Sequence, residues 1–156
     1  MKKRNKKYTP KAVVMNPLNY FLGGLKRIDA DHLVELNIKN HAAMDAICKG
    51  SGTKEHFDQL TGMQNMALVL TEMHFDNQYL EMLYAGRDAL HSLGERFRKH
   101  GKFVLTGEEM QKINNVLEVH EAQLVALRVI DIERAYDEIQ RRLKHNINVK
   151  KIGVAA

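Results

Sequence analysis

Apolar residues recur every three or four positions along most of this chain, and that spacing constrains it to fold as helices that each bury one face. Between residues 79 and 97 the intervals are 3, 4, 4, 3 and 4, at Tyr79, Met82, Gly86, Leu90, Leu93 and Phe97. Between residues 110 and 127 they are 3, 4, 3, 4 and 3, at Met110, Ile113, Leu117, His120, Leu124 and Leu127. The two prolines, Pro10 and Pro17, both precede this pattern, so neither interrupts it. We therefore predict an all-α fold.

Polar residues and glycines divide the pattern into separate helices, and we expect Gly50 and Gly101 to end the helices that precede them. We expect helices over 31–49, from 53 onward, over 79–100 and from 107 to 145. Thr106 and Glu109 have the spacing of a capping box, in which each side chain satisfies a backbone N–H of the other residue. The sequence leaves open whether a tight turn at 75–77 separates two helices and whether the last stretch bends or breaks near 128–131. Gly62, inside a predicted helix, costs about 1 kcal/mol relative to alanine and suggests a close contact between helices.

The 156 residues fit one domain. We predict a single-domain antiparallel bundle of four to five helices over 16–145, preceded by a flexible basic tail over 1–15 and followed by a frayed end over 146–156. Residues 18–22 form a short apolar segment after Asn16-Pro17, which we expect to make one or two helical turns that dock on the core. No apolar run approaches the ~20 residues of a membrane helix, so we expect a cytoplasmic protein that makes no membrane contact. The lone cysteine, Cys48, fits a reducing compartment, and we expect it to be a small buried hydrophobe near a helix end.

Charge is distributed unevenly along the chain. Residues 1–28 contain eight basic and no acidic residues, and the segment after Glu138 contains five basic and no acidic residues, so these ends together carry +13. Residues 29–138 contain 19 acidic and 11 basic residues, a net charge of −8. The basic arm is therefore our candidate for contacting a partner, through Lys2, Lys3, Arg4, Lys6, Lys7, Tyr8 and Lys11. A solvated tail without a partner is the plainer interpretation of such a run.

Eight histidines raise the question of a metal site, but none stands in a recognisable ligand motif: His32, His41, His56, His74, His91, His100, His120 and His145. We expect no metal ligands, no cofactor and no catalytic residues. His120 occupies an apolar-stripe position and, with Glu118 and Glu121, is our candidate for lining a pocket. A core histidine with a hydrogen-bond partner is the favoured alternative. Five amides on apolar helices either line a groove or fix helix pairing: Gln64, Asn65, Asn114, Asn115 and Gln123.

Three segments carry a resemblance to a known family. The basic stretch from Lys2 to Lys11 leading to Asn16-Pro17, together with 103–110 and 118–124, resembles an uncharacterised family of small helical proteins from proteobacteria and their prophages. The resemblance covers most of the chain and brings no activity with it. It implies a phage or mobile-element origin and a bacterial host cell.

The leading hypothesis is a non-enzymatic protein-binding helical module that acts on a host protein complex, with its basic arm on an acidic partner or on the other subunit of a homodimer. One alternative is an anti-defence inhibitor of the anti-CRISPR kind, whose acidic body would mimic nucleic acid. A second is nucleic-acid binding through the two basic ends. A third is a small enzyme or ligand-binding bundle that uses His120 with Glu118 or Glu121.

Overall fold

A computed structural model describes residues 17–145, and every regular element in that range is a helix, with one isolated β-bridge between Arg27 and Arg128. It comprises six helices: α1 Pro17–Gly24, α2 Ala30–Cys48, α3 Lys54–His74, α4 Leu80–His100, α5 Gly107–Ala126 and α6 Val129–His145. The all-α prediction is confirmed, whereas the count of four to five helices is too low. The short segment before Gly24 is a helix in its own right, because the proline at its start presets a helical φ angle.

Both of the breaks that the sequence left open are present. Between α3 and α4, Asp76 and Asn77 have φ angles of 46° and 62°, a left-handed conformation that a continuous helix cannot contain. Between α5 and α6, Leu127 is extended with a ψ angle of 166°. The Asp131 carboxylate then accepts a hydrogen bond from the backbone N–H of Arg128 at 3.2 Å, which supports the start of α6.

The predicted helix ends agree closely with the structure. Gly50 and Gly101 have φ angles of 77° and 69°, the left-handed stops expected after α2 and α4. Thr106 and Glu109 make the predicted capping box at the start of α5. The start of α3 has a second box, in which Nδ1 of His56 accepts a hydrogen bond from the N–H of Thr53 at 3.1 Å. The sequence did not suggest this box, because the usual partner of the threonine is Glu or Gln.

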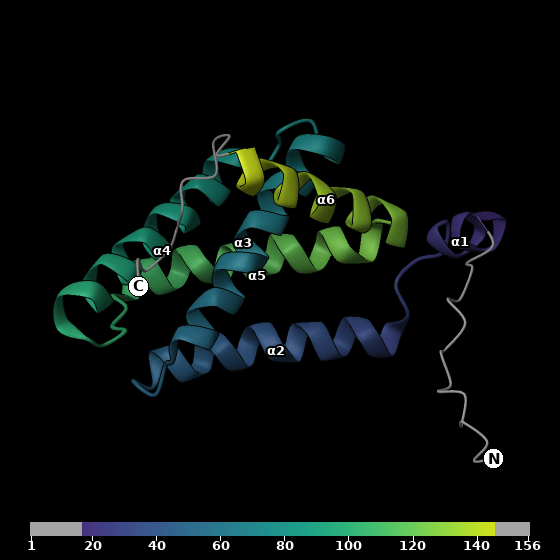
Figure 1. Cartoon of the computed structure of the whole chain (residues 1–156). Helices are drawn as coiled ribbons and strands as arrows, with labels where there is room; N and C mark the ends of the chain where they lie inside the picture. Colours follow the sequence, from purple (N-terminus) through teal and green to yellow (C-terminus); the bar gives the residue numbers. More distant parts are fainter. Residues whose placement is uncertain (1–16, 146–156) are drawn as a thin grey trace, which may run out of the picture.

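Helix α3 lies at the centre of the molecule and contacts α2, α4, α5 and α6. Figure 1 shows α3 running steeply across α2 and α5 instead of lying alongside them, with α6 and α2 on opposite sides of it. The antiparallel packing that we expected therefore stays a prediction. The main hydrophobic cluster joins α2, α3, α4 and α5, and a second one joins α3 to α6.

Phe103 anchors the loop between α4 and α5 in the core. Its ring stacks between Phe97, at a centroid distance of 4.1 Å, and Phe57, at 5.3 Å. Its neighbours in the loop are the exposed Val104 and the half-buried Leu105. Phe103 therefore pins this connector to the core.

A tight contact between helices occurs at a different glycine from the one we expected. A Cβ atom built on Gly62 meets no other atom within 4 Å, because this residue faces open space. A Cβ atom on Gly86 would lie 2.2 Å from Cγ2 of Val116 and 2.9 Å from Oε1 of Gln64. Gly86 therefore lets α4 pack against α5 and α3, and the prediction of a close contact at Gly62 was wrong.

The remaining predictions of domain organisation concern residues that the structure does not describe. The basic tail over 1–15 and the C-terminal segment over 146–156 lie outside residues 17–145. In this range, no helix combines the length and the apolar character that crossing a membrane requires.

Candidate functional site

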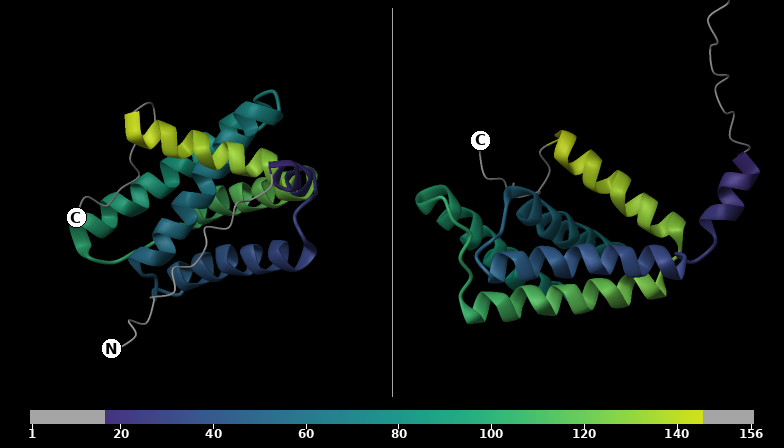
Figure 2. Two further views of the ribbon diagram at one scale, coloured as in Figure 1. Left: turned by 45° about the vertical axis from the view of Figure 1, so that its right-hand side comes forward. Right: turned by 90° about the horizontal axis from the view of Figure 1, so that it is seen from below.

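A groove of about 620 Å³ opens between α2, α3, α5 and α6. Its lining residues come from all four helices, with α3 and α6 contributing the most. Figure 2 shows the ribbons of α2 and α6 diverging from the end at which α6 begins. Most of its lining is apolar, from Leu36, Met63, Met66, Leu124, Ile132, Tyr136, Ile139 and Leu143.

Two buried polar side chains, Asn40 from α2 and His120 from α5, also line the groove, and each has an atom without a partner. Their exposed fractions are 1% and 2%. Oδ1 of Asn40 accepts a hydrogen bond from Nε2 of Gln59 at 2.7 Å, whereas its Nδ2 has no hydrogen-bond partner. Nδ1 of His120 also has none. Buried polar atoms are nearly always paired. Both atoms are themselves covered by protein, so a bound molecule can pair with them only after side chains at the groove move.

Burial determines the charge of His120. Loss of solvent around the imidazole lowers the pKa of His120 to about 4, against a smaller raising effect from Gln123. The ring is therefore neutral at pH 7, with one nitrogen as donor and the other as acceptor. It can exchange a hydrogen bond with a ligand, and it adds no positive charge to the groove.

The charged side chains along the groove are acidic. Glu55 and Asp58 come from the first two turns of α3, and both are exposed. Lysine and arginine are absent from the described residues that line the groove. An apolar ligand with a positively charged end would thus match both the lining and the rim.

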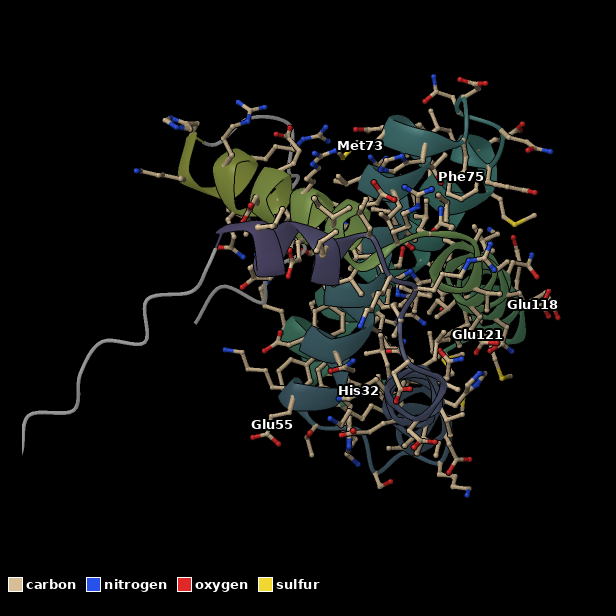
Figure 3. The ribbon with its side chains drawn as sticks, turned by 90° about the vertical axis from the view of Figure 1, so that its right-hand side faces the viewer. His32, Glu55, Met73, Phe75, Glu118 and Glu121 are labelled. Carbon is tan, nitrogen blue, oxygen red and sulfur yellow. The ribbon has the colours of Figure 1, made fainter. Side chains whose placement is uncertain are left out.

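The predicted pocket residues are only partly brought together. His120 lines the groove as expected, but neither Glu118 nor Glu121 is among the lining residues. Both acids are labelled on α5 in Figure 3, where Glu118 points to the outside. Glu121 instead lies 2.5 Å from Nε2 of His41, across the seam between α5 and α2. Residues two before and one after His120 face other sides of a 3.6-residue helix, so the three side chains do not form a unit.

The buried glutamines fix helix pairing, which was one of the two roles we predicted for the amides. Nε2 of Gln64 donates to the backbone carbonyl of Leu83 at 2.8 Å and ties α3 to α4. Nε2 of Gln123 donates to Oγ1 of Thr71 at 2.7 Å and ties α5 to α3. Asn65 has the other predicted role, because it lines the groove.

Asn40 is the groove residue that the sequence analysis missed. It continues a helical stripe that contains Leu36 four residues earlier and Ala43 three residues later. An asparagine in such a stripe is the same signal that singled out His120, and it was available from the sequence. That the two side chains share one groove depends on tertiary packing of α2 beside α5.

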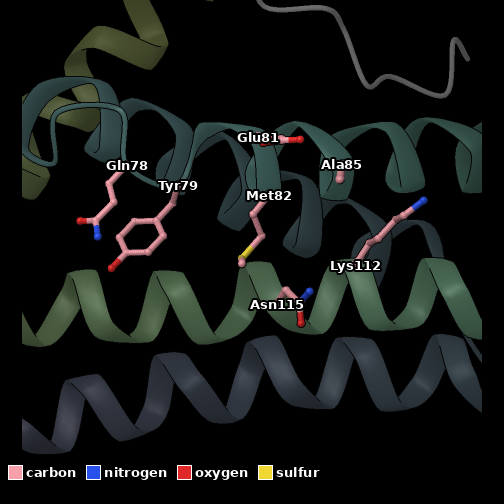
Figure 4. Close-up of a pocket in the computed structure, with 7 residues that line it drawn as sticks. All are labelled: Gln78, Tyr79, Glu81, Met82, Ala85, Lys112 and Asn115. Atoms are coloured by element: carbon pink, nitrogen blue, oxygen red, sulfur yellow. The ribbon is translucent and has the colours of Figure 1, made fainter.

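A second hollow of about 390 Å³ lies between the start of α4 and the middle of α5, as Figure 4 shows. Its lining includes Met82, Lys112 and Asn115. The side chains of Lys112 and Asn115 already make hydrogen bonds within α5. Nζ of Lys112 donates to Glu108 at 2.5 Å, and Oδ1 of Asn115 accepts from Gln111 at 3.0 Å. This hollow thus presents weaker features for recognition than the groove.

Metal and thiol chemistry receive no support from the described residues. Within residues 17–145, histidine, cysteine, aspartate and glutamate do not gather in a group of three that could hold a metal ion. Cys48 is exposed at the end of α2, so our expectation that it is buried was wrong. Its thiol points at Sδ of Met110 at 3.5 Å, and partial burial raises its pKa, which lowers its reactivity.

Comparisons with known proteins leave the family open. No protein-family model matches this chain, and neither a curated protein nor a solved structure is significantly similar to it. The resemblance to helical proteins of proteobacteria and their prophages stays a prediction. The arm residues from Lys2 to Lys11 lie outside the described residues.

Proposed function

We propose that this chain is a non-enzymatic protein-binding module whose groove receives an amphipathic helix with an apolar face and a basic end. The observation that carries the proposal is the groove itself, an apolar trough with acidic residues on its rim and two unpartnered polar atoms among its buried side chains. The apolar trough favours a partner with an apolar face, the acidic rim favours a basic end, and the unpartnered atoms favour a polar group on that face.

The dimensions suit a helix. The lining residues of α6 extend from Ile132 to Leu143, a distance of about 16 Å at ~1.5 Å per residue. Helices that bind in grooves use apolar anchors at positions i, i+3 or i+4, and i+7, which span about 10 Å. The α6 wall is thus long enough for three anchors on one face of a partner helix.

Polar groups set the orientation of the bound helix. Nδ2 of Asn40 is an unpaired but covered donor, and a side-chain movement that exposes it would favour a partner with an acceptor near the middle of its apolar face. Glu55 and Asp58 favour lysine or arginine at the end that lies over the start of α3. A helix with its basic end reversed would lose that ion pairing.

A synthetic helix tests the proposal directly. The probe is a fluorescent peptide of about 15 residues, long enough to form an isolated helix, with leucines at i, i+4 and i+7 and lysines at one end. We expect saturable binding by fluorescence anisotropy. Gly62→Trp should weaken it at least tenfold, because Gly62 lines the groove and faces open space. Gly62→Ala is the matched control and should leave the affinity unchanged.

A double variant, measured with two peptides, tests the acidic rim. The double variant Glu55→Gln with Asp58→Asn should weaken binding of the lysine-ended peptide several-fold and reduce its salt dependence. The same double variant should leave a peptide with neutral ends unaffected. Equal affinity of Gly62→Trp and wild type for the lysine-ended peptide would reject the groove as the binding site.

In the cell, we propose that the partner is a bacterial host protein or complex, and that the basic arm over 2–11 adds contacts to an acidic surface. Deleting residues 1–15 should then leave the fold intact and weaken recovery of the partner from the native host. The anti-defence and nucleic-acid hypotheses remain alternatives to this role. A gel shift at low salt that disappears steeply with added salt would favour nucleic-acid binding over it.

A further inference from the structure

Helix α1 projects from one end of the molecule. Figures 1 and 2 show it lying beyond the ends of α2 and α6. It contacts the start of α6, where Gly24 lies so close to Ile130 that a Cβ atom would come within 3.0 Å of that side chain. A backbone hydrogen bond of 2.9 Å, from the N–H of Val129 to the carbonyl of Lys26, fixes the segment that follows.

Three exposed leucines lie on the α1 arm, by which we mean residues 18–27. Leu18 and Leu22 share one face of α1, and Leu25 follows in the turn directly after the helix; Leu22 has an exposed fraction of 51%. Apolar side chains at this spacing are the anchors that a helix presents to a groove. Lys26 and Arg27, both exposed, follow directly and form a basic end.

On the premise of the proposed function, we propose that the groove's occupant is the α1 arm of a second copy of this chain. The arm has the chemistry that the groove selects for, with three exposed leucines and a basic end that complements Glu55 and Asp58. The hydrogen bond from Val129 to Lys26 holds each α1 arm so that it points away from its own body, toward another molecule. Two copies that exchange arms form two such contacts.

The oligomeric state of the full chain tests this arrangement. By sedimentation equilibrium we expect wild type to have twice the monomer mass of 17.9 kDa at high protein concentration. Leu22→Glu on the arm and Gly62→Trp in the groove should each give a monomer. Val104→Glu, at an exposed loop residue with an exposed fraction of 56%, is the control and should leave the dimer intact. Circular dichroism checks that each variant keeps its helical content.

Mixing the two monomeric variants provides the decisive step. Leu22→Glu has an intact groove and Gly62→Trp has an intact arm, so one arm–groove contact can form between them. We expect the mixture to form a heterodimer that is weaker than the wild-type dimer, whereas each variant alone stays monomeric. Two variants that merely damage the fold would show no such recovery.

Three results would overturn the arm exchange. They are a monomeric wild type, a dimer that survives both Leu22→Glu and Gly62→Trp, and a mixture that does not associate. A monomeric wild type that binds the synthetic helix, with the effect of Gly62→Trp intact, would refute only the arm exchange. Loss of binding to the synthetic helix as well would refute the proposed function with it.

Discussion

Alanine substitutions at two glycines should have opposite effects on stability, because one glycine faces open space and the other lies where helices touch. Both Gly62 and Gly86 are inside helices, so alanine at either position gains about 1 kcal/mol of helix propensity. At position 62 nothing opposes that gain, since the new Cβ meets no atom within 4 Å. We expect Gly62→Ala to raise the free energy of unfolding by about 1 kcal/mol.

At position 86 the gain is outweighed by overpacking. The new Cβ would lie 2.2 Å from Cγ2 of Val116, a fully buried side chain, and 3.4 Å from the backbone carbonyl oxygen of Lys112. Relieving that overlap requires α4 and α5 to separate, and overpacking of a tight core costs about 3 kcal/mol at the upper end of the usual range. After the propensity gain, Gly86→Ala should lower the free energy of unfolding by about 2 kcal/mol.

Urea denaturation followed by far-ultraviolet circular dichroism measures both changes under one set of conditions. The two variants should differ from each other by about 3 kcal/mol, with the dependence of free energy on urea concentration unchanged. A Gly86→Ala variant as stable as wild type would refute the packing of α4 on α5 described above. A destabilised Gly62→Ala variant would show that this residue is covered.

Three further predictions concern single side chains. His120 is neutral when folded but binds a proton near pH 6.5 when unfolded, so stability should fall between pH 6.5 and pH 4, by about 2–3 kcal/mol at pH 4.5. Urea denaturation of His120→Gln at pH 7 and pH 4.5 should show a smaller loss, and a loss equal to that of wild type would contradict the burial of a neutral imidazole. Thr106→Ala should reduce the free energy of unfolding by about 1 kcal/mol through loss of the α5 cap, and no measurable change would show that the cap does not contribute. Gln123→Leu should cost about 1–3 kcal/mol, because it leaves the Thr71 hydroxyl without its donor, and adding Thr71→Val should recover part of that loss. An additive double variant would argue against this buried hydrogen bond.

Local features of the fold were predictable because they depend on residues close together in the sequence. The capping box at Thr106, the stops at Gly50 and Gly101 and the burial of His120 all follow from helical periodicity and backbone chemistry. The capping box at Thr53 was missed because histidine replaces the usual carboxylate or amide there.

Features that depend on how helices meet could not be predicted in the same way. Gly86 stands in the apolar stripe from Tyr79 to Phe97, so its inward position was predictable, but its close approach to Val116 depends on how α4 packs on α5. The pairing of His120 with Asn40 in one groove likewise requires α2 to lie beside α5. Glu118 and Glu121 were grouped with His120 by closeness in sequence, although helix geometry turns them to other sides.

Methyl NMR of the full chain with the lysine-ended synthetic helix tests most directly whether an apolar segment binds in this groove. We predict that the methyl resonances of Met66, Ile132 and Ile139 shift as the peptide is added, and that those of Met82, in the second hollow, do not. Shifts confined to Met82, or no shifts at peptide concentrations that saturate the anisotropy signal, would contradict the account.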